Sequence, residues 1–176
     1  MERTLVIFKP DAVQRGIVGE ILSRFEKVGL KIVGMKMLNP DYDHYYHHYE
    51  TIGKMISRRG QAQFEVQLGA MQEGPVIAGV LEGVGAVALV RKLVGTTSTD
   101  EAAPGTIRGD YAHASIEYVN KHNVALPTIM HASGDREEAS QEIAHWFSES
   151  EIFADYQTVH EYFTQPRPGA KKKTQK

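Results

Sequence analysis

The segment Leu5-Val6-Ile7-Phe8, followed at once by Lys9-Pro10-Asp11, predicts the first strand of a sheet. A short apolar run rich in Val and Ile is typical of a buried strand. Proline lacks the backbone N–H that a strand ladder needs, so the strand should end before Pro10. The charged pair Lys9 and Asp11 would then lie at the end of a buried strand, where functional side chains often gather.

Further elements follow from hydrophobic periodicity and from turn residues. Residues 17–28 carry an apolar helical stripe that Gly29 ends. Asp135 opens a helix with a capping pattern and should turn Ile143, Trp146 and Phe147 inward. The other expected elements are helices over 42–58 (capped by Asp41), 62–72 and 84–94, a possible helix over 114–121, and strands over 30–38, 75–81 and 126–130.

The order of these elements predicts an α+β fold, an α/β sandwich of one sheet and packed helices. The core pattern βαββαβ is that of a ferredoxin-like fold with a four-stranded, mainly antiparallel sheet, helices on one face and added helices. Residues 1–164 should form one domain. Residues 165–176 are basic and poor in large apolar groups. They predict a flexible C-terminal tail, either a solvated end or a weak anion-binding arm.

Composition excludes several classes of function. The chain has 176 residues, a net charge of −2 and no cysteine. It therefore has no disulfide, no thiolate metal site and no cysteine nucleophile. The near-neutral charge makes nucleic acid an unlikely main partner, and no apolar run approaches the roughly 20 residues that span a bilayer. The first residues do not resemble a signal peptide, so we expect a cytoplasmic protein without membrane contact.

The residue with the strongest chemical signal is His131. It closes a short apolar run and opens His131-Ala-Ser133-Gly-Asp135, just before a helix. An imidazole in such a place suits a phosphoryl acceptor when cations hold the phosphates. Because no glycine-rich phosphate loop exists in the chain, side chains must do the holding, and the candidates are Lys9, Arg91 and Arg108.

Three motifs and one glutamate make the chain resemble the nucleoside diphosphate kinases. They are Phe8-Lys-Pro-Asp-Ala-Val-Gln-Arg-Gly16, Pro104-Gly-Thr-Ile-Arg-Gly-Asp110, His131-Ala-Ser133, and Glu142 in the following helix. The resemblance runs from about Glu2 to Tyr162. It implies a ping-pong reaction, in which a nucleoside triphosphate gives its γ-phosphoryl group to a histidine and a nucleoside diphosphate takes it away.

The resemblance also implies the catalytic roles. His131 would be the nucleophile through Nδ1, and Glu142 would orient the ring and fix its tautomer. Ser133 would contact the same glutamate, and Lys9 would assist the transfer. Ser133 alone could equally serve as a turn or helix cap, and both roles are compatible.

For the nucleotide, the resemblance implies that Lys9, Arg91, Arg108 and Thr97 contact phosphates, Phe64 stacks on the base, and Tyr49 lies beside His131. Thr128 stands where the family usually has a ribose-binding asparagine, and Asn123 is the alternative. Mg²⁺ should arrive with the nucleotide phosphates, so no protein metal site is expected. The helical spacing of His44, His47 and His48 would allow a transition-metal pair, but a solvated helix face is favoured.

Two stretches depart from the family pattern. Residues 52–63 and 111–127 are longer than usual, which would alter one lip of the nucleotide cleft and a region where subunits touch. These departures and Thr128 support the alternative of a catalytically weak paralogue that acts as a nucleotide-binding scaffold or sensor. By resemblance, a homo-oligomer, either hexamer or tetramer, is expected.

Overall fold

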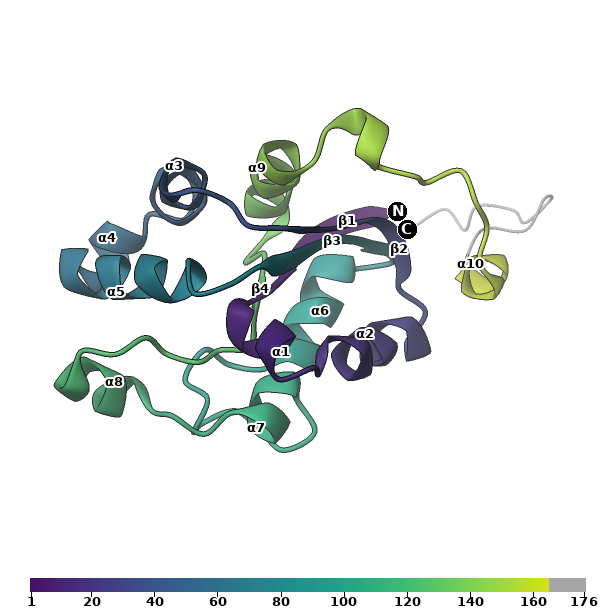
Figure 1. Ribbon diagram of the computed structural model, residues 1–176. Helices are drawn as coiled ribbons and strands as arrows, with labels where there is room; N and C mark the ends of the chain where they lie inside the picture. Colours follow the sequence, from purple (N-terminus) through teal and green to yellow (C-terminus); the bar gives the residue numbers. More distant parts are fainter. Residues whose placement is uncertain (165–176) are drawn as a thin grey trace, which may run out of the picture.

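Four strands form a single sheet in the computed structural model, which describes residues 1–164 (Figure 1). Along the sheet the order is β2 (Lys31–Leu38), β3 (Val76–Gly83), β1 (Glu2–Phe8) and β4 (Met130–Ala132), and every neighbouring pair is antiparallel. The apolar run of β1 is fully buried because it lies between two strands and under two layers of helices. The predicted α+β class and four-stranded antiparallel sheet are confirmed.

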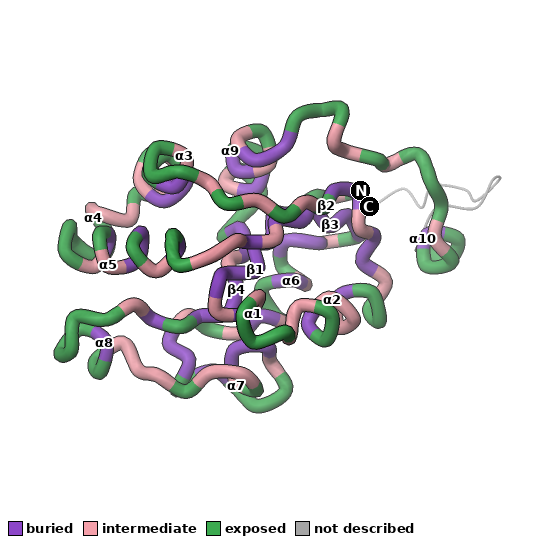
Figure 2. Tube along the Cα trace, in the orientation of Figure 1, coloured by how far each residue is buried: buried purple, intermediate pink, exposed green. Residues whose placement is uncertain are grey.

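Helices cover both faces of this sheet (Figure 1). Val6 and Phe8 join a core with α2 (Val18–Lys27) and α6 (Ala86–Val94) on one face. Leu5 and Ile7 point to the other face and join a second core with α5 (Gln61–Met71) and α9 (Arg136–Trp146). Figure 2 shows the buried residues running along the strands between these layers. The expectation of helices on one face was wrong, because the apolar sides of the added helices need the second face of the sheet.

The predicted helix over 42–58 forms as three pieces. These are α3 (Tyr42–Tyr46), capped by Asp41 as expected, a π-helical segment η1 (His47–Ile52), and α4 (Met55–Arg59). Lys54 adopts a left-handed φ of 52° between the last two, which turns the chain. π-helical segments are rare and often mark functional sites. Here the segment carries His48 and Tyr49 inward, where both are buried.

The strand predicted over 126–130 forms later, as β4. Pro127 lacks an N–H, and Ile129 has a φ of 64°, which no strand residue adopts. Pairing with β1 therefore begins at Met130, opposite Phe8, and places His131 opposite Ile7. The remaining short helices are α1 (Pro10–Gln14), α7 (Ile107–Tyr111), α8 (Ile116–His122), η2 (Glu149–Glu151) and α10 (Val159–Thr164).

A buried lysine holds the C-terminal segment against the sheet. The side chain of Lys31 in β2 is only 2% exposed and donates to the carbonyl of Ala154 at 2.6 Å and to that of Tyr156. Its ammonium group also lies 3.4 Å from Glu161 in α10. These contacts hold the chain against the sheet between Ala154 and Glu161. The predicted basic tail, residues 165–176, lies outside the described residues.

Candidate active site

A cleft of about 220 Å³ opens where β1 ends and β4 begins. Strand pairing and the turn after β1 bring its floor together, while α4 and α8 form opposite walls (Figure 1). The cleft collects most of the predicted site residues, although they come from distant parts of the chain. Those that line it are Lys9, Tyr49, Arg91, Thr97, Arg108, Thr128, His131 and Glu142.

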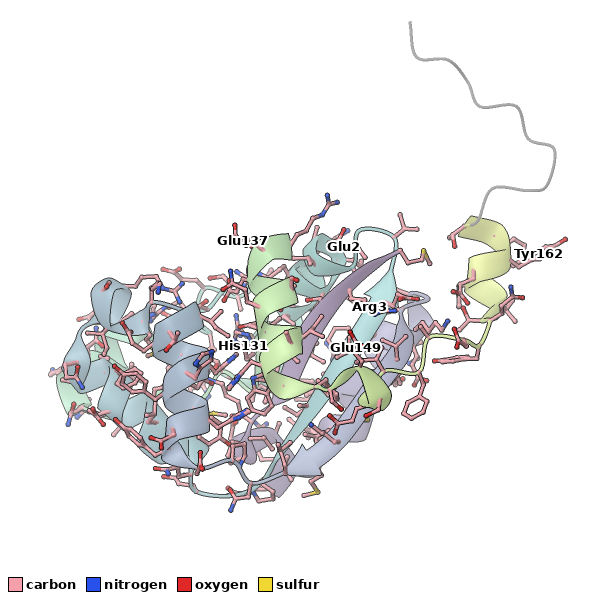
Figure 3. All side chains as sticks on the ribbon, turned by 90° about the horizontal axis from the view of Figure 1, so that it is seen from above. Glu2, Arg3, His131, Glu137, Glu149 and Tyr162 are labelled. Atoms are coloured by element: carbon pink, nitrogen blue, oxygen red, sulfur yellow. The ribbon has the colours of Figure 1, made fainter. Side chains whose placement is uncertain are left out.

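His131 and Glu142 form a close pair at the inner end of the cleft. Nε2 of His131 lies 2.7 Å from Oε1 of Glu142, which is fully buried on α9. Ser133 donates its hydroxyl proton to Oε2 of the same carboxylate at 2.6 Å, and its Oγ accepts from the backbone of Leu5 at 3.2 Å. In Figure 3, His131 lies beside α9, whose first turn is marked by Glu137. The fold therefore brings His131, Glu142 and Ser133 together.

Burial controls the protonation of the pair. It lowers the pKa of His131 well below its usual range, and the cations Lys9 and Arg108 lower it further. The imidazole is therefore neutral near pH 7. Burial raises the pKa of Glu142, against the opposing effects of His48 and the Ser133 hydrogen bond. Since Nε2 is buried against Glu142, it carries the single ring proton, and Nδ1 keeps the lone pair that a nucleophile needs.

Lys9 and Thr128 meet on the floor of the cleft. Nζ of Lys9 donates to Oγ1 of Thr128 at 2.7 Å, and both residues are buried. Burial lowers the pKa of Lys9 to about 8, and the nearby Asp11 only partly opposes this. Lys9 is thus a cation at neutral pH that has given up most of its water, so it gains strongly from an incoming anion.

Arg108 clamps the segment that leads into β4. Its guanidinium donates to the carbonyls of Gly95 at 3.0 Å, Thr128 at 3.2 Å and Met130 at 2.9 Å. Burial lowers its pKa to about 10, helped by nearby arginines, so it stays charged. Five N–H groups are available on a guanidinium. Two therefore remain for a ligand, and Arg108 combines a structural and a binding capacity.

The clamped segment contains a strained residue. Ile129 has a φ of 64°, a conformation that a β-branched side chain rarely adopts. Its N–H donates to Oδ2 of Asp11 at 3.2 Å, and its carbonyl accepts from the Lys9 N–H at 3.0 Å. Such strain costs about 1–3 kcal/mol and persists where the surroundings hold it in place. It sets the direction in which His131, two residues later, enters the cleft.

Arg91 and Thr97 line the more exposed part of the cleft, whereas Tyr49 lines it from a buried position. Arg91 is an exposed residue of α6, and Thr97 lies in the loop after it. The ring of Tyr49 is 6.4 Å from that of His131, centroid to centroid. Its buried hydroxyl has no hydrogen-bond partner within residues 1–164, and burial raises its pKa. An unpartnered buried hydroxyl that lines a cleft is suited to meet a ligand group.

The structure corrects the assignment of Phe64. This ring is fully buried in the second core and packs edge-on against Tyr46, so it does not line the cleft. The preceding residue, Gln63, does line it. Counting back from Gly74-Pro75 finds α5 but cannot say which side of that helix faces the cleft, because the rotation of a helix about its axis is set by the surfaces it packs against.

The two long stretches form the opposite lips of the cleft. Residues 52–63 supply Arg58 and Arg59 from α4, and residues 111–127 supply Val119 and Asn120 from α8. Asn123, considered as a ribose contact, is instead the exposed, left-handed C-cap of α8 and does not line the cleft. Of these two residues, Thr128 is the one that lines the cleft.

Sequence reasoning missed three residues near His131. His48 from η1 and Trp146 from α9 are both buried, and their side chains meet behind Glu142. Glu138 lines the cleft and accepts from the N–H of Gly134 at 3.0 Å. The spacing of Glu138, Glu142 and Trp146, four residues apart, does place them on one helix face. For His48 the sequence shows only that several histidines stand close together. That pattern does not say which of them turns toward the core.

One group of possible metal ligands exists within the described residues: His48, His131 and Glu142, whose ligand atoms lie within 4.8 Å of one another. Within this group, Oε1 of Glu142 already faces Nε2 of His131 at 2.7 Å, and Nδ1 of His48 accepts from Trp146. These contacts within the group account for its close spacing without an ion. Separately, no helix among residues 1–164 is a candidate for spanning a bilayer.

Comparison with known proteins agrees with this geometry. Residues 2–152 match the family model described as nucleoside diphosphate kinase. A nucleoside diphosphate kinase of Pyrococcus furiosus is 43% identical over 171 residues, which cover 97% of this chain and 98% of the relative. A second, from Borreliella burgdorferi, is 40% identical over 86% of this chain and 90% of its own length.

Solved structures show the same likeness. A transition-state mimic of the nucleoside-diphosphate kinase from Borrelia burgdorferi, with bound vanadate and ADP, has a TM-score of 0.86 at 39% identity. That match covers 91% of this chain and 94% of the other. A halophilic enzyme from Halobacterium salinarum in complex with CDP has a TM-score of 0.77 at 34% identity, over 94% and 99% of the two chains. This chain therefore belongs to the nucleoside diphosphate kinase family and acts as a nucleotide phosphotransferase.

Proposed function

We propose that His131 carries the phosphoryl group between two nucleotides. Nδ1 attacks the γ-phosphorus of a nucleoside triphosphate, the bond to the bridging oxygen breaks, and a nucleoside diphosphate leaves. A second diphosphate then attacks the phosphohistidine through its terminal phosphate oxygen and restores the free ring. The contact that carries this proposal is the 2.7 Å approach of His131 Nε2 to the buried Glu142. It directs the lone pair of Nδ1 toward the cleft and stabilises the charged ring that phosphorylation creates.

The surrounding cations neutralise the moving phosphates. Phosphoryl transfer depends mainly on positioning and on charge stabilisation. We assign Lys9 and the two remaining N–H groups of Arg108 to the transferred group, and Arg91 with Thr97 to the other phosphates. Ser133 keeps Glu142 in place through its 2.6 Å hydrogen bond. All of these except Ser133, which is buried behind the glutamate, line the same cleft.

We also propose loose recognition of the base. Tyr49 and Thr128 lie deep in the cleft, where Thr128 can meet a ribose hydroxyl together with Lys9. Gln63 and Val119 also line the cleft, and contact with side chains of this kind does not require one particular base. The related enzymes above hold ADP in one case and CDP in the other, which agrees with tolerance of base identity.

Enzymes of this family are phosphotransferases that need a divalent cation, and we propose Mg²⁺ carried by the nucleotide. The carboxylates that line the cleft are Glu138 and Glu142. Oε2 of Glu142 accepts from Ser133, Oε1 faces Nε2 of His131 at 2.7 Å, and Glu138 accepts from the backbone. Mg²⁺ keeps most of its waters and needs few protein ligands. The donor set therefore suits an ion that enters on the phosphates.

We propose that the protein works as a homo-oligomer, hexamer or tetramer. β2 is at the edge of the sheet and exposes Met35 and Met37, which are 40% and 59% accessible. Tyr162 of α10 projects into solvent and is 73% exposed (Figure 3). Apolar edge strands pair readily with another chain. Light scattering of the purified protein, compared with a Met37→Lys variant, tests this directly.

Two further assignments complete the proposal. Residues 1–164 form the catalytic unit, and residues 165–176 are an appendage that this chemistry does not use. The enzyme works in the cytoplasm, where nucleoside diphosphates and triphosphates are made and consumed.

Phosphorylation of the enzyme tests the central proposal. The protein is incubated with Mg²⁺ and γ-labelled ATP, beside a His131→Ala variant and a matched control, His113→Ala, which changes an exposed histidine outside the cleft. Acid-labile, base-stable label should appear on the native protein and the control, be absent from His131→Ala, and be removed by GDP. Absence of label on folded native protein would refute the phosphohistidine mechanism.

A further inference from the structure

His48 is a buried histidine that the proposed reaction does not use. Its side chain is 1% exposed and lies between Trp146 and the reacting pair. The indole Nε1 of Trp146 donates to Nδ1 of His48 at 3.2 Å. An indole N–H can only donate, so Nδ1 of His48 must accept and cannot carry a proton. The single proton of the neutral ring therefore sits on Nε2.

The same nitrogen faces the catalytic carboxylate. Nδ1 of His48 is 3.6 Å from Oε1 of Glu142, the oxygen that faces His131 at 2.7 Å. The His48 ring also packs edge to face against the His131 ring, with centroids 4.6 Å apart and planes at 82°. A proton on Nδ1 of His48 would make it a second donor to this oxygen and a competitor of His131.

We propose that His48 and Trp146 are a positioning pair that reserves Glu142 for His131. The indole holds His48 in the tautomer that cannot donate to the carboxylate, while the His48 ring supports the edge of the nucleophile. This inference rests on the proposed role of His131 as phosphoryl carrier. Trp146 lies four residues after Glu142 on α9, so one face of this helix carries both the carboxylate and the indole that holds His48.

The groups around His48 support a neutral ring. It faces His131 from β4, Glu142 and His145 from α9, and His44 from α3. Burial lowers its pKa well below the usual range, the three histidines act in the same direction, and only Glu142 opposes them. If the indole N–H were lost, protonation at Nδ1 toward Glu142 would become favourable. His48 would then compete with His131 for the carboxylate as the pH falls.

The test is Trp146→Phe, which keeps an aromatic ring and removes the N–H. Long-range ¹H–¹⁵N NMR of the unphosphorylated, full-length protein reads the tautomer of His48 directly. We expect Nε2–H in the native protein and a shift toward Nδ1–H in the variant. Phosphorylation of His131 should slow about fivefold, the equivalent of one lost neutral hydrogen bond of about 1 kcal/mol. The acidic limb of the pH–rate profile should move to higher pH.

A double-mutant cycle separates positioning from packing. In a His48→Phe background there is no tautomer to control, so adding Trp146→Phe should leave the pH–rate profile unchanged. An equal shift of the profile in both backgrounds would overturn the proposal. So would an Nδ1–H signal for His48 in the native protein, a result that needs no variant to fold. Failure of the phosphohistidine mechanism is seen separately, as native protein that takes no label.

Discussion

Replacing Arg108 with lysine tests how the floor of the cleft is held together. The guanidinium is buried, in a residue only 4% exposed, and reaches three carbonyls, those of Gly95, Thr128 and Met130, at 2.9–3.2 Å. A lysine ammonium is a single centre on a flexible stem and cannot span these three acceptors. At least two carbonyls should lose their donor, and the strained residue Ile129 between two of them should relax.

The expected loss of stability follows from these bonds. A hydrogen bond from a charged group contributes about 1.5–3 kcal/mol, so two of them correspond to about 3–6 kcal/mol before water replaces part of the loss. We expect about 3 kcal/mol, which for a domain of this size lowers the melting temperature by about 6–12 °C. The rate of His131 phosphorylation should fall about 100- to 1000-fold, because a donor to the transferred group is misplaced.

Calorimetry and single-turnover labelling measure the two effects side by side. The matched control is Arg91→Lys, because Arg91 lines the same cleft but donates no hydrogen bond to the backbone within residues 1–164. The control should lose rate and keep its melting temperature. If Arg108→Lys melts within about 2 °C of the native protein, a shift too small for even one lost bond, the clamp reasoning is refuted.

Three other perturbations have expected outcomes. Ser133→Ala removes the 2.6 Å hydrogen bond to Glu142 and so raises the pKa of that carboxyl further. We expect kcat to fall about tenfold and the loss of activity on acidification to begin at a higher pH. An unchanged pH–rate profile would contradict this. The pKa of Lys9 is about 8, so the affinity for ADP, measured by calorimetry, should decrease as the pH rises through 8. The affinity of the Lys9→Arg variant should not change over the same pH range. The pKa of His44 is lowered to about 4, mainly by burial and then by the stacked His145. As the pH falls, His44 is therefore protonated in the unfolded chain before it is protonated in the folded protein. The free energy of unfolding should therefore decrease as pH falls from about 6.5 to 4, and a constant value in urea titrations would contradict it.

The predictions that held depended on local patterns. The apolar run of β1, the N-caps at Asp41 and Asp135, and the stop at Gly29 follow from interactions within a few residues, which the sequence displays directly. The long motifs around Lys9 and Arg108 also identified residues that do line one cleft. Local chemistry was sufficient there because each motif carries its own turn and its own functional side chain.

The predictions that failed depended on which side of an element faces its neighbours. Phe64 lies on α5 as expected, but the rotation of that helix turns it into the core. β4 starts at Met130 because pairing with β1 and the strained Ile129 decide where the ladder begins. Neither the rotation of a helix nor the register of a strand can be read from a single segment, because both depend on the neighbouring element against which the segment packs or pairs.

Sequence alone was enough for the fold class and the family, because these rest on residue types in fixed local order. The tertiary structure decided which groups share a low-dielectric space. It placed His48 and Trp146 behind Glu142, and it engaged Arg108 with three carbonyls. Protonation states and hydrogen-bond partners depend on burial and on distances of a few ångströms between segments about 100 residues apart, and only the folded chain creates those distances.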